Sequence, residues 1–174
     1  RPGGAVSYGR SMATEEHVVE FERGEVGAVV AEMAELTARG DGQGWINIRP
    51  VLSEQDERFV PVRTGLAAWL SGRGPVVAMA TWMPPVTVGR PRATQVGIEH
   101  GTGPKALPRL ADAGLPLPSG WLKRQDHAKH GIVADLPPDA DPAEAVDWMV
   151  AATAALMSVV EAGNRWVAII HRPA

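Results

Sequence analysis

Cysteine is absent from all 174 residues of the chain. Without cysteine there is no disulfide, no thiolate nucleophile and no sulfur-based zinc site, so any metal would need histidine and carboxylate ligands. Long apolar runs are also lacking. No segment approaches the roughly 18 uninterrupted apolar residues of a membrane helix, and the N-terminus has no apolar signal core. We therefore expect a cytoplasmic protein that does not associate with membranes and carries no cofactor.

The chain has little net charge, because 17 basic residues nearly balance 20 acidic ones and leave −3 at pH 7. A protein dedicated to binding a phosphate backbone usually carries a stronger positive field, so nucleic acid is not the expected partner. Arginine makes up 14 of the basic residues, and alanine, glycine, valine and proline are abundant. This composition is typical of a high-GC bacterium, so we attribute the arginine preference to codon usage.

The length and the apolar fraction of 45% fit one domain with a sizeable core. Residues 1–14 have no apolar periodicity and include two adjacent glycines. We interpret them as a flexible N-terminal extension or as vector-derived sequence. No linker poor in apolar residues divides 15–174, which are predicted to form a single α/β domain.

Apolar periodicity predicts about ten secondary-structure elements. Alternating or continuous apolar patterns predict strands at 17–23, 45–49, 75–82, 95–100, 132–137 and 165–171. Helical spacing and capping residues predict helices at 25–39, 53–72, 105–113 and 141–160. The order β-α-β-α-β-β-α-β-α-β indicates an α/β (α+β) fold, a mixed sheet of about six strands with about four helices. The strand "PVVAMATW" is expected in the middle of the sheet, and 115–131 is expected to be a loop.

The last predicted helix has the clearest start in the chain. Asp141 fits its N-cap, Pro142 its first position and Glu144 its third. Two apolar stripes run along the helix, so it is either deeply buried or in contact with a partner.

The segment "EHGTGPK" at 99–105 joins a strand to a helix through a glycine turn. Free backbone N–H groups and the helix dipole make such a turn a ready site for phosphate or carboxylate. Thr102 could cap the helix or bind an anion, Lys105 could add charge, and Gly103 would allow close approach of a ligand. His100 could act as general acid or base. The alternative is a plain tight turn with a hydrogen-bonded histidine, since G-x-G without a third glycine is a weak motif.

A second candidate is "QDHAKHG" at 125–131, where Asp126 and His127 could form an acid/base pair. His127 and His130 have the ligand type of a metal site, but in a loop their spacing has no fixed geometry, and a solvated rim is the more common outcome. Trp121 lies in irregular chain between the two segments. Its indole could stack on a ligand or contact a partner, or it could close the end of a core under a loop.

These segments give two functional hypotheses. The first is a small polar pocket that binds an anionic small molecule; if catalytic, it would be a hydrolase or transferase with histidine as proton carrier and no metal. Its candidate catalytic residues are His100, Asp126 and His127, and its candidate ligand-binding residues are Thr102, Gly103, Lys105 and Trp121. The second is a non-enzymatic interaction or structural subunit that forms a homodimer through the C-terminal helix or the sheet edge. No serine lies in a G-x-S-x-G setting, which argues against a serine hydrolase.

Overall fold

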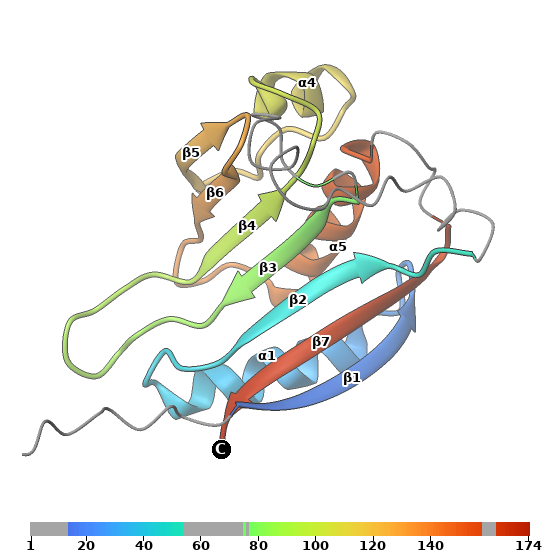
Figure 1. Ribbon diagram of the computed structural model, residues 1–174. Helices are drawn as coiled ribbons and strands as arrows, with labels where there is room; N and C mark the ends of the chain where they lie inside the picture. Colours follow the sequence, from blue (N-terminus) through green and yellow to red (C-terminus); the bar gives the residue numbers. More distant parts are fainter. Residues whose placement is uncertain (1–13, 54–74, 76, 158–162) are drawn as a thin grey trace, which may run out of the picture.

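The computed structural model describes residues 14–53, 75, 77–157 and 163–174. Seven strands form one sheet in the order β1-β7-β2-β3-β4-β6-β5 (Figure 1). The strands are β1 (Thr14–Glu22), β2 (Trp45–Pro50), β3 (Met79–Met83), β4 (Gln95–Glu99), β5 (Leu122–His127), β6 (Gly131–Asp135) and β7 (Arg165–Pro173). The helices of the described part are α1 (Gly27–Arg39), α4 (Ala106–Asp112) and α5 (Pro142–Ala155).

The sheet is antiparallel at every pairing, not mixed as the sequence predicted. Two β-α-β units occur among the described residues, and a third strand lies between the parallel strands of each; the sequence predicted the first unit but not the second, because it did not predict β5. β1 and β2 are joined by α1 and flank β7, whereas β4 and β5 are joined through α4 and flank β6. A strand from elsewhere in the chain therefore separates the two parallel strands of each unit.

The predicted number of strands was too low, because β5 falls in the segment expected to be a loop. β5 is an edge strand that pairs only with β6, and most of its side chains are exposed or half-buried. A strand with little buried surface has no apolar alternation to reveal it. The helix predicted at 53–72 lies almost entirely outside the described residues, so the predicted element order is not confirmed. β3 is the middle strand, as expected from "PVVAMATW".

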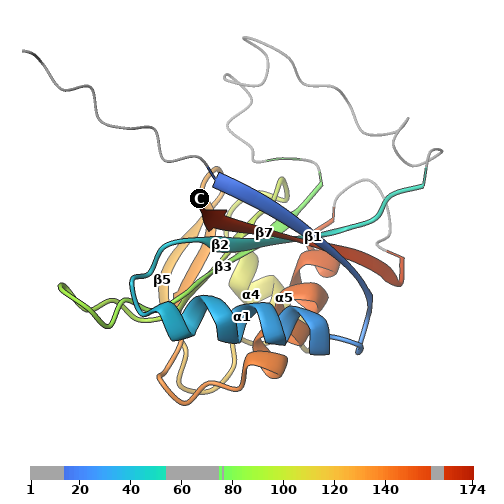
Figure 2. The ribbon, with the colours of Figure 1, turned by 90° about the horizontal axis from the view of Figure 1, so that it is seen from below.

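The register of the strands aligns buried side chains on one face of the sheet, where they form the core. Ile170, Ile46, Trp82, Val96 and Ala134 are cross-strand neighbours from β7 to β6, and all of them are buried. Cross-strand neighbours point to the same face of a sheet. Helices α1 and α5 cover this face and contact each other (Figure 2). We call it the helix-covered face.

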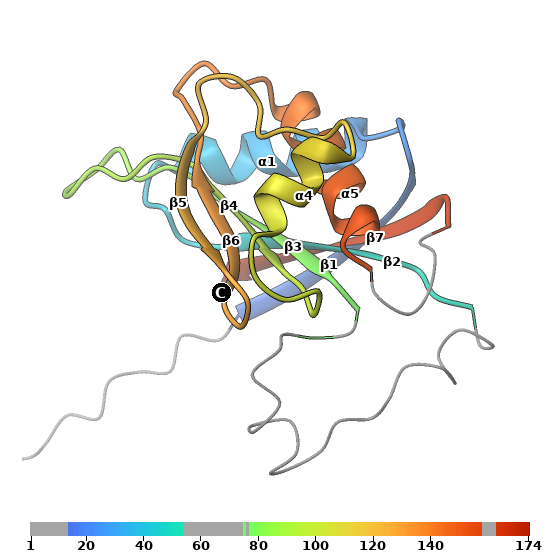
Figure 3. The ribbon, with the colours of Figure 1, turned by 90° about the horizontal axis from the view of Figure 1, so that it is seen from above.

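The prediction of deep burial for the last helix is confirmed. Within α5 the residues of both stripes are buried except Ala155, which is exposed, and 158–160 lie outside the described residues. The helix packs against α1 and contacts β2, β3 and β4. Its start is also as predicted: Asp141 accepts a hydrogen bond from the Ala143 N–H at 2.9 Å, and Pro142 takes the first position. α4 contacts β5 and β6 at the far end of the sheet (Figure 3). No helix in the described part of the chain has the length and apolar character needed to cross a bilayer.

Candidate functional site

His100 follows β4 directly and has no exposed surface. Its Nδ1 lies 3.0 Å from the Thr102 hydroxyl, and its Nε2 is buried without a partner among the described residues. Burial lowers the pKa of His100 below its ordinary value of 6.5, and the charge of Arg109 lowers it further, whereas the charge of Asp126 opposes both. The imidazole is therefore held neutral and out of contact with solvent.

Asp126 binds the start of α4. Its two carboxylate oxygens accept hydrogen bonds from the backbone N–H groups of Ala106 and Leu107, each at 3.0 Å. The helix start therefore attracts a negative group, as the sequence pattern indicated, and the chain supplies that group itself. An external anion would have to displace this carboxylate. Binding of an anion at the turn stays a prediction.

The other residues of the turn hold its shape. Gly103 and Lys105 both have positive φ, at 87° and 60°. Thr102 is held by Arg109, whose guanidinium donates to its carbonyl oxygen at 2.8 Å and also to its hydroxyl. Lys105 is exposed and precedes α4 directly.

The structure brings His100 and Asp126 together but separates His127 from both. Asp126 pairs with Ile132 and lies on the helix-covered face, and its neighbour His127 points to the opposite face because successive strand residues alternate. The His127 Nδ1 accepts from the backbone N–H groups of Lys129 and His130, at 3.1 and 3.3 Å. Within the described residues, no group of three histidine, aspartate or glutamate side chains could hold a metal ion.

Trp121 fills the end of the core, one of the two roles expected for it. It is 8% exposed and makes an edge-on contact with Trp148, with ring centroids 5.3 Å apart and planes at 63°. The Trp148 indole N–H donates to the Pro116 carbonyl at 2.9 Å. These contacts pin the 114–121 connection onto α5.

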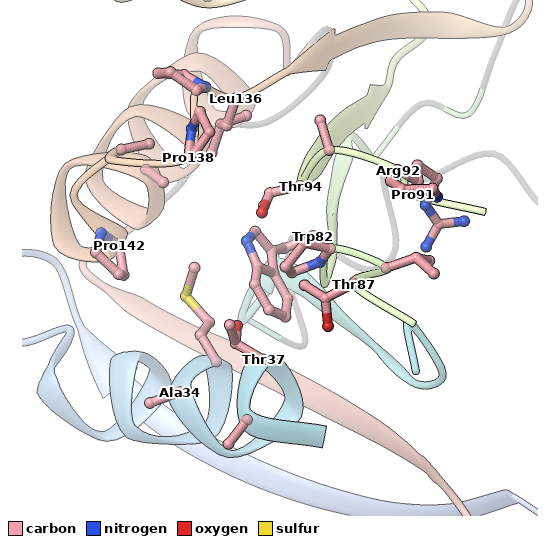
Figure 4. A pocket seen from close by; sticks show the side chains of 18 residues that line it. Ala34, Thr37, Trp82, Thr87, Pro91, Arg92, Thr94, Leu136, Pro138 and Pro142 are labelled. Carbon is pink, nitrogen blue, oxygen red and sulfur yellow. The ribbon is translucent and has the colours of Figure 1, made fainter. Parts of the chain in front are cut away.

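The structure contains a pocket that the sequence did not indicate. It encloses about 840 Å³ between α1, β3, the β3–β4 connection and the β6–α5 connection (Figure 4). Most of its lining is apolar, with Met33 and Ala34 contributed by α1 and Leu136 by the β6–α5 connection. Five prolines form much of its wall: Pro85, Pro91, Pro137, Pro138 and Pro142. A cavity of this size and character is typical of small-molecule sites.

Trp82 of β3 lies at the centre of the pocket (Figure 4). It is only 3% exposed, and its indole N–H has no hydrogen-bond partner in the described part of the chain. This nitrogen is not fully enclosed, and Figure 4 shows the Trp82 ring among the side chains that line the pocket. Figure 4 shows this nitrogen on the side of the ring that faces α5.

The β3–β4 connection forms one wall by docking on the turn after α1. The Thr87 and Val88 N–H groups both donate to the Gly40 carbonyl, at 2.9 and 3.3 Å. Gly40 and Gly42 have positive φ, and a Cβ at Gly42 would lie 2.2 Å from the Val86 Cγ2. Glycine is therefore required here both for backbone conformation and for close approach of the wall.

The signals for this pocket were in the sequence but pointed to loops. The proline-rich segment at 83–94 is typical of an irregular connection, and both it and 137–142 are largely irregular in the structure. Proline content gives no information about which two connections meet across a helix. That meeting depends on the strand order, which puts β3 and β6 on either side of β4.

The opposite face of the sheet carries a connected polar network. The His171 Nδ1 lies 3.3 Å from the Glu16 carboxylate, its Nε2 lies 3.1 Å from the Asn47 amide nitrogen, and the Thr81 hydroxyl donates to the Asn47 oxygen at 2.9 Å. Trp45 stacks on His171 at 4.5 Å. With Nδ1 as donor to Glu16 and Nε2 as acceptor from the Asn47 amide, His171 satisfies every hydrogen bond of this network.

The fold and the pocket define an α/β protein with an antiparallel sheet and a ligand-sized apolar cavity under its helix-covered face. No protein-family model, curated protein or solved structure matches the chain. Function must therefore be argued from the site itself.

Proposed function

We propose that this protein binds a small, largely apolar molecule in the pocket around Trp82, as a binding protein and not as an enzyme. The observation that carries the proposal is the cavity of about 840 Å³ with a central buried indole and apolar walls. Pockets of about 300–1,000 Å³ with such linings are where proteins bury most of a drug-sized ligand.

The chemistry of the lining supports binding over catalysis. Arg92 is the one ionisable residue among those that line the pocket in the described chain. Its guanidinium Nη2 donates to the carbonyls of Pro84 and Gly42, at 3.3 and 3.4 Å. The lining therefore offers no acid/base pair and no activated nucleophile.

The pocket walls are conformationally restricted, which favours a site that is formed before the ligand binds. Each proline has a fixed φ, so a wall built from five of them has few conformations to lose when a ligand binds. The β3–β4 connection is further held by its hydrogen bonds to Gly40. A site that is ordered before binding avoids much of the entropic cost of association.

The proposal is tested with Nile red, a neutral apolar dye whose emission rises in an apolar environment. We expect a saturable increase in emission with the unmodified chain and its loss in Ala34→Trp, which places a large ring at the pocket wall. Ala31→Trp is the matched control, because Ala31 is also exposed on α1 but does not line the pocket. No saturable binding, or equal binding by both variants, would contradict the proposal.

The two functional hypotheses from the sequence, anion binding and homodimer formation, do not involve this pocket. Anion binding at the 99–105 turn concerns another region and would require Asp126 to be displaced or the buried His100 to open. A homodimer through α5 has less support, because most of the described apolar residues of that helix are buried in the chain's own core. Pairing through a sheet edge stays a prediction, and β1 presents a nine-residue edge for it.

A further inference from the structure

The polar atoms that line the pocket indicate which charge and which hydrogen-bonding groups a ligand should have. We propose that the ligand is an uncharged apolar molecule with one hydrogen-bond acceptor, and that the Trp82 indole N–H binds this acceptor. This inference rests on the proposed function, since it concerns the same pocket.

The Trp82 indole N–H is a hydrogen-bond donor without a partner in the described part of the chain. An indole N–H is a donor only, and a buried donor without a partner costs free energy. The Trp148 and Trp166 indoles donate to carbonyls of the chain, at 2.9 and 3.2 Å. Trp82 is buried to a similar degree yet has no such partner among the described residues. Its donor faces the cavity, where a ligand acceptor can reach it (Figure 4).

The polar groups of the lining favour an uncharged ligand. The neutral hydroxyls of Thr37 and Thr94 line the pocket and make no hydrogen bond to the rest of the described chain. Arg92, the one cation of the described lining, already donates to two carbonyls through Nη2, and its Nε is buried without a partner among the described residues. A carboxylate bound at the Trp82 N–H would lose its hydration and gain only a neutral donor there, whereas a carbonyl or ether oxygen needs only one donor.

Three naphthalenes of similar shape separate these requirements when each is used to displace Nile red. 2-Acetylnaphthalene carries a neutral acceptor, 2-ethylnaphthalene carries none, and 2-naphthoate carries a charge. We expect the acetyl compound to bind about three- to tenfold more tightly than the ethyl compound, the range of one hydrogen bond. We expect the naphthoate to bind more weakly than the acetyl compound.

Trp82→Phe keeps an aromatic ring and removes the donor. It should remove the preference for acetyl over ethyl while the ethyl compound still binds. An equal preference in the wild type and the variant, or tightest binding of the naphthoate, would overturn the inference and leave the proposed function intact. A chain that binds neither Nile red nor any naphthalene would contradict both.

A second measurement does not depend on the variant folding. In the ¹⁵N-labelled chain, one indole N–H resonance should move downfield with the acetyl compound and not with the ethyl compound. Indole resonances that respond identically to the two compounds would also overturn the inference.

Discussion

Replacing Gly42 with alanine tests how the pocket wall is held. Gly42 has φ +68°, and a Cβ there would lie 2.2 Å from the Val86 Cγ2 in the β3–β4 connection. A left-handed conformation costs a non-glycine residue about 1–2 kcal/mol. Relieving the overlap adds about 1–3 kcal/mol, as in other overpacked sites. We therefore expect Gly42→Ala to lower the free energy of unfolding by about 2–5 kcal/mol.

The chain provides a matched control for this variant in Gly89→Ala. Gly89 lies in the same β3–β4 connection with φ +87°, but a Cβ there would meet nothing within 4 Å. It should lose only the backbone contribution of about 1–2 kcal/mol. Urea denaturation with linear extrapolation measures both values, and Nile red titration measures the pocket.

The two variants should also differ in binding. Val86 lines the pocket, so its displacement in Gly42→Ala should weaken Nile red binding, whereas Gly89→Ala should bind as the wild type does. If both variants lose the same stability and bind the dye equally, the wall does not depend on the close approach at Gly42, and the reasoning is refuted.

Two further predictions concern the 99–105 turn. Burial lowers the pKa of His100 in the folded chain, so folding favours the neutral imidazole. The contribution of His100 to the free energy of unfolding should be complete above pH 6.5 and should be lost as the pH falls below it. His100→Gln should flatten this pH dependence in urea titrations across pH 5–8. Parallel pH profiles of the two chains would contradict that cause. Asp126→Ala should lower stability by about 1–2 kcal/mol, because the Ala106 and Leu107 N–H groups lose their acceptor, and Asp126→Asn should lose less because its amide oxygen can still accept. Equal stability of Asp126→Ala and the wild type would show that the cap contributes nothing.

The sequence predicted most elements because their signals are local. The helix at α5 was identified from Asp141, Pro142 and two apolar stripes, and the structure shows the cap and buries most of the described stripe residues. β3 was identified as the central strand because its residues are apolar on both alternating faces. β5 was missed because an exposed edge strand has no apolar pattern.

The 99–105 turn shows a second limit of prediction from the sequence. The sequence predicted an anion site at the turn at 99–105, because a helix start favours a negative group. In the structure the Asp126 carboxylate binds the start of α4, and binding of an external anion stays a prediction. The sequence could not indicate that Asp126 comes from the strand paired beside β6 and binds there. Which charged group lies next to a helix end is decided by the register of distant strands.

The sequence by itself determined the α/β class and most of the elements. The tertiary structure decided the antiparallel sheet, because β7 and β6 are each inserted between strands that a local β-α-β pattern joins. It also decided the pocket, because only the strand order brings the β3–β4 and β6–α5 connections around Trp82. Local periodicity records which side of an element is buried, whereas pairing between distant strands depends on the packing of the whole chain.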